Sequence, residues 1–366
     1  MEISTEQYRG VLIDFLEAVE YEEPDCDTDS VMQQRIGDLA FVYSGTVGHF
    51  LEPDSRQLLV AIEEQHLLAV IRTVTRMVAL SWQGIPQPVM LTLSIHFTHF
   101  VLGDDSREDP SRLMENFVPD LLQGVQQSHP IWKSMFSFFP EVLGHYGSFL
   151  QITMLNSILD FVQACWIERW RSGATPGSAE YPMFLRRLSS LGTFCAATLF
   201  PSSKIDEREN FEDITTALAH FIPIVALIND LFSFYKETKE GEEDESIVGN
   251  ICTAEGVSVE QALRKVSEDS VRACQTLDQV LRDSGSGTIA DTVSSFIQGY
   301  IRWHLCEERY RMEDLADAPG ENAVKFRLFR NLACKAGGVR LVDFTQLTPA
   351  TVPQNTLAYL ERTPGN

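Results

Sequence analysis

The sequence predicts an all-α protein. Apolar residues recur three and four positions apart along most of the 366-residue chain, and this spacing places them on one face of an α-helix. Strict alternation of apolar and polar residues is rare, and convincing hairpin turns are missing. We therefore expect about ten helices and no sheet. They would form one domain over residues 1–340, followed by an irregular tail over 341–366.

The predicted helices follow one another with short breaks. The breaks fall where glycine, proline, serine and charged residues cluster, as in 83–88, 172–177 and 284–287, because these residues favour turns. None of the breaks is a convincing interdomain linker. Helical spacing is found near residues 5–22, 31–50, 55–80, 111–126, 147–171, 183–199, 208–237, 258–283 and 288–314, and a further apolar helix runs from 91 into Asp104.

Composition and charge disfavour several classes of function. The chain has 29 Lys and Arg against 52 Asp and Glu, a formal net charge of −23. Such a surface repels phosphate backbones and anionic lipid, so we expect no nucleic-acid partner. No apolar run looks long enough for stable membrane insertion, and the first residues lack the pattern of a signal peptide. We therefore expect a cytoplasmic protein.

Acidic residues cluster where the helix that runs into Asp104 ends. Asp104 and Glu108 are four positions apart, so they project from one helix face and repel each other unless a cation lies between them. Oxygen ligands on a partly open face suit Mg²⁺, which shares its coordination shell with substrate phosphates. The alternative is an ordinary solvated acidic helix end, because acidic runs are common.

A second set of oxygen donors lies after a very apolar helical segment, 221–228. Asn229, Ser233 and Glu237 are spaced four and four, so they form a gently inclined stripe on one helix. An amide oxygen, a hydroxyl and a carboxylate can hold one hard cation together, and Lys236 beside them could meet an anion. The alternative is a helix that leaves the core, with Asn and Ser as caps and Glu237 solvated.

Both motifs resemble those of the fungal trichodiene synthase family of class I sesquiterpene cyclases. Residues 104–110 resemble its aspartate-rich motif, and 229–237 resemble its second metal motif, Asn-x3-Ser-x3-Glu. Residues 181–187 are similar to the segment with a diphosphate-sensing arginine, and 303–311 to the segment whose Arg-Tyr pair contacts diphosphate. The likeness runs from roughly residue 40 to 340, with the same order and spacing. Departures are Glu108 for a third aspartate, Gly103 for a larger apolar residue, and Ser190 where a glycine is often found.

The resemblance implies a class I terpenoid synthase helical bundle around a central apolar cavity. It implies a lyase of fungal secondary metabolism that takes farnesyl diphosphate with three Mg²⁺ ions, and a tendency to form homodimers. The implied metal ligands are Asp104, Glu108, Asn229, Ser233 and Glu237. Catalytic groups would be Asp104 together with the diphosphate-binding Arg186, Lys236, Arg309 and Tyr310. Aromatic walls of the substrate cavity would include Phe97 and Tyr300, with Phe194 and Trp303 as further candidates.

Several alternatives stay open from the sequence alone. A cyclase could let water or an amine capture the cation, for which Gly103 offers room. A prenyl chain-elongating synthase normally shows two Asp-rich motifs, and here the second is Asn/Ser/Glu. The alternative without enzyme activity is a helical scaffold that binds a partner on its acidic face. His96 and His99 lack a third metal ligand and are expected in the core, while Glu168 lies near the metals or pairs with an arginine such as Arg169.

Overall fold

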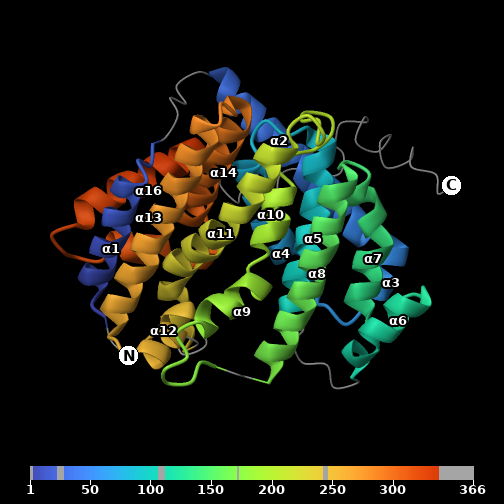
Figure 1. Ribbon diagram of the computed structural model, residues 1–366, viewed down its shortest axis with the longest axis horizontal. Helices are drawn as coiled ribbons and strands as arrows, with labels where there is room; N and C mark the ends of the chain where they lie inside the picture. Colours follow the sequence, from blue (N-terminus) through green and yellow to red (C-terminus); the bar gives the residue numbers. More distant parts are fainter. Residues whose placement is uncertain (1–2, 23–28, 106–111, 171–172, 242–245, 338–366) are drawn as a thin grey trace. The chain divides into compact units, whose positions relative to one another are not determined.

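The computed structural model describes residues 3–22, 29–105, 112–170, 173–241 and 246–337, apart from the side chains of 29–33 and 336. Every regular element among these residues is a helix: sixteen α-helices and two 3₁₀ helices (Figure 1). This confirms the all-α prediction. By their internal contacts the described residues form two compact units, one within Met1–Asp25 and Gly147–Gly337 and one within Cys26–Tyr146. The predicted tail, 341–366, lies outside the described residues.

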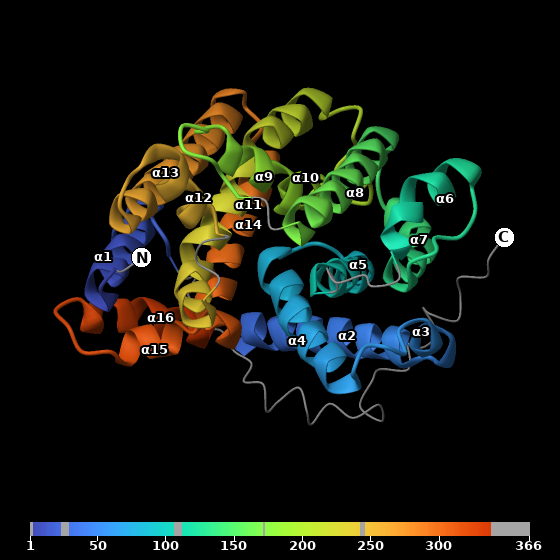
Figure 2. The ribbon, with the colours of Figure 1, turned by 90° about the horizontal axis from the view of Figure 1, so that it is seen from below.

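The unit with Cys26–Tyr146 is organised around one central helix, α5 (Gln87–Asp105). Nearly every residue from Val89 to Gly103 is buried, because α5 packs against α2, α4 and α7 (Figure 2). Its buried Ser94 accepts a hydrogen bond from Thr46 of α2 at 2.9 Å. The other helices of this unit are α2 (Asp29–Leu51), α3 (Pro53–Leu58), α4 (Glu64–Ser81), η1 (Leu113–Asn116), α6 (Phe117–Gln123) and α7 (Pro130–Leu143).

His96 and His99 lie in the core of this unit, as predicted. The His96 ring stacks on Phe139 of α7 with a centroid distance of 5.2 Å, and His99 Nε2 lies 2.9 Å from Ser134 Oγ. Burial lowers the pKa of His96 to about 3 and that of the neighbouring His49 to about 4. The described residues hold no group of three His, Cys, Asp or Glu side chains placed for a metal, so these histidines act as neutral core aromatics.

We expect His96→Phe to make the protein less sensitive to acid. The folded state keeps His96 neutral down to about pH 3, whereas the unfolded chain takes up this proton near pH 6.5, so wild-type stability falls as pH drops below 6.5. One such histidine lowers the free energy of unfolding by about 2 kcal/mol at pH 5 relative to pH 7. Urea unfolding of both proteins at pH 7.5 and pH 5 measures the difference. An unchanged pH dependence of stability in His96→Phe would contradict the expectation.

The unit with Gly147–Gly337 is built around α11 (Phe211–Glu240), which packs on α10, α13 and α14. Helix α1 (Thr5–Ala18) lies between α13 and α16 (Figure 2), and Tyr8 of α1 donates a hydrogen bond to the Leu231 carbonyl at 2.6 Å. The remaining helices are α8 (Ser148–Arg169), α9 (Tyr181–Ser189), α10 (Gly192–Ala197), α12 (Ile247–Glu255), α13 (Val259–Asp283), α14 (Gly287–Cys306), η2 (Glu308–Tyr310), α15 (Met312–Asp317) and α16 (Ala323–Gly337).

Some predicted helix bounds are wrong. The segment 183–199 is broken between α9 and α10, where Leu191 adopts a left-handed φ of 55°. The break lets α10 approach α11 so closely that a Cβ on Gly192 would lie 2.9 Å from the Ile222 backbone. Segment 55–80 likewise divides into α3 and α4, and α14 ends at Cys306 rather than at 314. Helices α7, α12 and α16 were not predicted; α7 holds Pro140 inside it, which argues against a helix locally.

The prediction that no apolar segment is long enough to span a membrane is wrong, as judged by length and composition. Among the described residues, Ser148–Arg169 and Phe211–Glu240 are both long and apolar enough. Of the most apolar stretch in α11, 72% is buried by the rest of the protein, and the share for α8 is 44%. Both values fit helices that supply the core of a folded unit, for which the same apolar composition is needed.

Candidate active site

The predicted oxygen stripe lies on the C-terminal half of α11. Asn229, Ser233 and Glu237 follow one another at intervals of four, so the α-helix aligns them on one side. Asn229 and Glu237 are half-buried. Ser233 is only 5% exposed, and its Oγ has no hydrogen-bond partner among the described residues. A buried hydroxyl without a partner is costly, which fits a group that is satisfied only when a ligand is bound.

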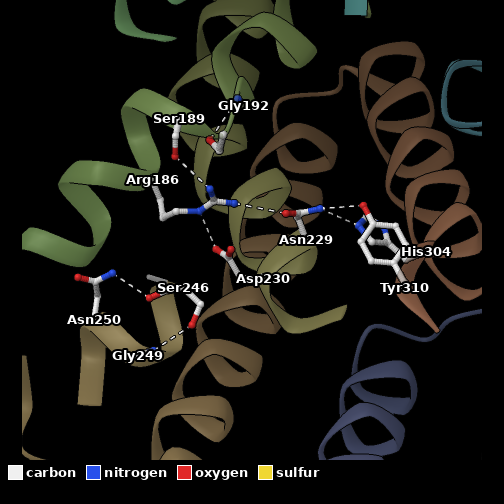
Figure 3. A network of polar contacts seen from close by, with 11 residues as sticks. Arg186, Ser189, Gly192, Asn229, Asp230, Ser246, Gly249, Asn250, His304 and Tyr310 are labelled. Carbon is white, nitrogen blue, oxygen red and sulfur yellow. Dashed lines mark hydrogen bonds and ion pairs between the residues drawn. The ribbon is translucent and has the colours of Figure 1, made fainter. Parts of the chain in front are cut away.

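Arg186 of α9 reaches the same part of α11 (Figure 3). Its Nε donates to Asp230 Oδ2 at 2.8 Å, and its Nη1 donates to Ser189 Oγ at 3.0 Å. Its Nη2 faces the side-chain oxygen of Asn229 at 3.4 Å, a long contact. The guanidinium is therefore held beside the predicted metal ligand Asn229 by the buried carboxylate of Asp230.

The electrostatics around Arg186 are dominated by carboxylates. Burial raises the pKa of Asp230 to about 7 against the opposing attraction of Arg186, and the charge of Glu237 adds to the rise. Burial also works to lower the pKa of Arg186, but the attraction of Asp230, Glu168 and Glu237 outweighs it and the pKa is raised. Glu168 therefore lies close enough to act on Arg186. Several carboxylates around one arginine make this region attractive to further cations.

The amide of Asn229 is held on its other side by α14 and η2. Its Nδ2 lies 3.2 Å from His304 Nε2 and donates to Tyr310 Oη at 3.1 Å (Figure 3). His304 is completely buried, and its Nδ1 lies 2.8 Å from the Tyr300 carbonyl oxygen. Residues from three separate helical segments thus meet at one side chain of α11.

Aromatic rings surround this polar group. Tyr300 stacks on Trp303 at a centroid distance of 5.6 Å, and Trp303 meets Tyr310 edge to face at 5.2 Å. Burial raises the pKa values of Tyr300 and Tyr310, so both hydroxyls stay protonated and can donate. Phe194 of α10 is fully buried in the same unit. The predicted Tyr300, Trp303 and Tyr310 therefore do come together.

Two further predicted diphosphate ligands are Lys236 and Arg309. Lys236 Nζ pairs with Glu240 Oε2 at 3.1 Å within α11. Arg309 is exposed, and its side chain makes no ion pair with the described residues. Their roles as diphosphate ligands stay predictions.

The first acidic motif belongs to the other unit and is described by itself. Asp104 is half-buried in the last turn of α5, and the neighbouring Asp105 pairs with His66 at 3.0 Å. Glu108 lies outside the described residues. A Cβ on Gly103 would lie 3.0 Å from the Trp132 ring, so the space opened by this glycine is filled by that side chain. The predicted cavity residue Phe97 is buried, and its ring centroid lies 5.2 Å from that of Trp82. Its role in binding substrate stays a prediction.

The donor set of the α11 stripe fits Mg²⁺. It consists of an amide oxygen, a buried hydroxyl without a partner and a carboxylate, which are the hard oxygen ligands that Mg²⁺ takes. The carboxylates around Arg186 supply compensating negative charge. Nitrogen and sulfur ligands, which would suit zinc or iron, are absent from the stripe.

Sequence reasoning missed two residues of this site, Asp230 and His304. Both lie inside segments with recognised motifs, and neither has the spacing of a metal ligand or the charge of a diphosphate ligand. A signal was nevertheless present, because a carboxylate and an imidazole lie on strongly apolar helices. Buried polar groups need partners, so both residues could have been expected to contact other polar groups. Asp230 is 4% exposed and His304 is 0% exposed.

The fold is that of terpene synthases. The solved structure of linalool/nerolidol synthase from Streptomyces clavuligerus superposes with a TM-score of 0.52 over 71% of this chain and 94% of that one, with 16% identical residues. This likeness confirms the predicted fold class of a terpenoid synthase helical bundle.

The family follows from the sequence comparisons. The family model described as trichodiene synthase (TRI5) matches residues 2–360. Trichodiene synthase of Stachybotrys chartarum is 35% identical over 348 residues, covering 94% of this chain and 89% of that protein. The enzyme of Fusarium culmorum is 36% identical over 339 residues, covering 92% and 89%. The chain belongs to the trichodiene synthase family, which confirms the likeness that its motifs indicated.

Proposed function

We propose that this protein binds farnesyl diphosphate with Mg²⁺, ionises it, and cyclises the resulting carbocation to a sesquiterpene while diphosphate is released. As a member of the trichodiene synthase family it is a class I sesquiterpene cyclase, and therefore a lyase. The observation that supports the proposed site most directly is the α11 stripe. It combines the buried Ser233 hydroxyl, which has no hydrogen-bond partner in the described part of the chain, with an Asn229 oxygen that faces Arg186.

The chemistry requires the leaving group to be neutralised. Separating a carbocation from a diphosphate in an apolar site is prohibitively costly unless that negative charge is compensated. Bound Mg²⁺ supplies Lewis acidity at the diphosphate oxygens. In this proposal Asn229, Ser233 and Glu237 hold one ion. Asp104, with Glu108, would hold the rest of a set of three.

Protein donors would complete the binding of the diphosphate. Arg186 can keep its Nε bond to Asp230 while N–H groups of its two Nη atoms donate to diphosphate oxygens, because their present contacts are to a hydroxyl and a distant amide oxygen. Lys236, Arg309 and Tyr310 would add charge-assisted hydrogen bonds, which strengthen as negative charge grows on the leaving group.

The hydrocarbon part of the substrate would meet aromatic walls. Tyr300 and Phe97 present buried ring surfaces, and ring faces stabilise a nearby cation without reacting with it. Exclusion of water protects the carbocation from capture. A central cavity, a homodimer and a cytoplasmic location are further parts of this proposal, supported by the family likeness.

We expect the purified protein to convert farnesyl diphosphate to a volatile sesquiterpene hydrocarbon and diphosphate when Mg²⁺ is present, and not when it is chelated. Gas chromatography with mass spectrometry and a diphosphate assay measure both products. Absence of both would overturn the proposal. A sesquiterpene alcohol or amine would identify capture of the cation by a nucleophile, and a longer prenyl diphosphate formed with isopentenyl diphosphate would identify chain elongation.

A further inference from the structure

The side chain of Asn229 makes different contacts on its two sides. On one side, two neutral groups, His304 Nε2 and Tyr310 Oη, lie 3.2 Å and 3.1 Å from its Nδ2. On the other side, the guanidinium Nη2 of Arg186 lies 3.4 Å from its Oδ1 (Figure 3). An amide has one oxygen and one nitrogen, so only one of its two orientations presents an oxygen to a metal ion.

The tautomer of His304 selects that orientation. The Tyr300 carbonyl oxygen can only accept, so His304 Nδ1 carries the proton and donates to it at 2.8 Å. Nε2 of the neutral ring is then an acceptor and requires a donor. The Asn229 Nδ2 group meets this need. A flipped amide would place its oxygen against the Nε2 lone pair and its N–H groups against the N–H groups of Arg186.

The ring of His304 is itself fixed by packing. It is completely buried between the rings of Tyr300 and Tyr310, each with a centroid 4.4 Å away, and that of Trp303 at 4.6 Å. A ring that is locked in this way directs its lone pair to one point. Rigid support of this kind is what places a metal ligand accurately.

We propose that His304 is a positioning residue for the metal site: its Nε2 holds the Asn229 amide with Oδ1 turned toward the cation. The inference rests on the proposed function, because Asn229 must be a metal ligand for its orientation to matter. It assigns to the Trp303-His304 segment a role distinct from that of Tyr310, which also donates to diphosphate in the proposed function.

The matched pair of variants is His304→Phe and His304→Gln. Phenylalanine keeps an aromatic ring of similar size among the neighbouring rings but has no hydrogen-bond acceptor. Glutamine offers an amide oxygen that can accept from Asn229 Nδ2. We expect His304→Phe to raise the Mg²⁺ concentration for half-maximal activity by roughly ten-fold, because loss of such outer support weakens metal sites by this amount or more. At saturating Mg²⁺ the kcat should change less, and His304→Gln should lie close to wild type.

Metal binding without turnover supplies a second readout. Mn²⁺ titration in the presence of inorganic diphosphate, followed by electron paramagnetic resonance, should show the same roughly ten-fold weakening in His304→Phe and recovery in His304→Gln. Circular dichroism and thermal unfolding without metal report whether each variant is folded. Equal weakening in both folded variants would mean that His304 only fills space, and would overturn the inference.

Two further measurements keep the outcomes separate. If Asn229→Ala binds Mn²⁺ as wild type does, the proposed metal site fails. If Asn229→Ala is impaired and His304→Phe is not, the proposed site stands and the inference about His304 fails. Nitrogen-15 NMR of histidine-labelled wild type tests the tautomer without any substitution. A proton on His304 Nε2 instead of Nδ1 would overturn the inference even if neither variant folds.

Discussion

Asn229→Ala is expected to lower kcat/KM for farnesyl diphosphate by roughly a hundred- to a thousand-fold. The substitution removes one of three oxygen ligands from the α11 stripe, and a metal ion at a developing negative charge contributes several kcal/mol to transition-state stabilisation. Asn229 is only half-buried, so the substitution should lower the free energy of unfolding far less than it lowers turnover. Steady-state kinetics at saturating Mg²⁺ and thermal unfolding measure the two effects.

Ser233→Ala sharpens this prediction because its two effects have opposite signs. The Ser233 hydroxyl is buried and has no hydrogen-bond partner among the residues that the structure describes, so removing it should leave the metal-free protein as stable as wild type or more stable. Turnover should nevertheless fall. Asn331→Ala, at an exposed position of α16, is the matched control and should change neither quantity. Turnover within about three-fold of wild type in Asn229→Ala would reject the metal assignment.

Arg186→Met should reduce both stability and turnover, and a second substitution separates the two. Loss of Arg186 leaves Asp230 buried, at 4% exposure, without its ion-pair partner. An unpaired buried charge of this kind costs about 3–5 kcal/mol. Because burial already raises the pKa of Asp230 to about 7, the carboxylate takes up a proton at lower pH, and the loss should be larger at pH 8 than at pH 6.

The double variant Arg186→Met with Asp230→Asn should recover most of the stability, because no charge is left unpaired. It should not recover turnover, since the donor to the leaving group is still absent; we expect a loss of roughly a hundred-fold. Urea unfolding and steady-state kinetics on Arg186→Met, on Asp230→Asn alone and on the double variant complete the cycle. Recovery of turnover in the double variant would show that Arg186 acts only as a structural partner of Asp230.

Local patterns predicted the parts of the site that a single helix sets. The spacing of Asn229, Ser233 and Glu237 puts them on one side of α11 whatever surrounds it, because helix geometry alone decides this. The same holds for the all-α class and for most helices, whose apolar spacing is local. Where neighbouring elements override local preference the prediction failed: the bounds near Leu191 were wrong, and α7, which holds Pro140, was missed.

Other features arise only from contacts between segments far apart in sequence. Arg186 and Asp230 are 44 residues apart, and Asn229 and His304 are 75 residues apart. Nothing in the spacing of α9, α11 and α14 along the chain reveals these pairs. The orientation of the Asn229 amide is likewise unreadable from sequence, since it depends on which atom of His304 carries a proton.

The sequence by itself determined that this chain is helical, that its family is that of the trichodiene synthases, and which oxygen donors line one face of α11. The tertiary structure alone decided that Asp230 holds Arg186 and that His304 faces Asn229. The reason is physical: periodicity along a helix records which face is buried, whereas the partner of a buried polar group is chosen by whichever distant segment packs against that face.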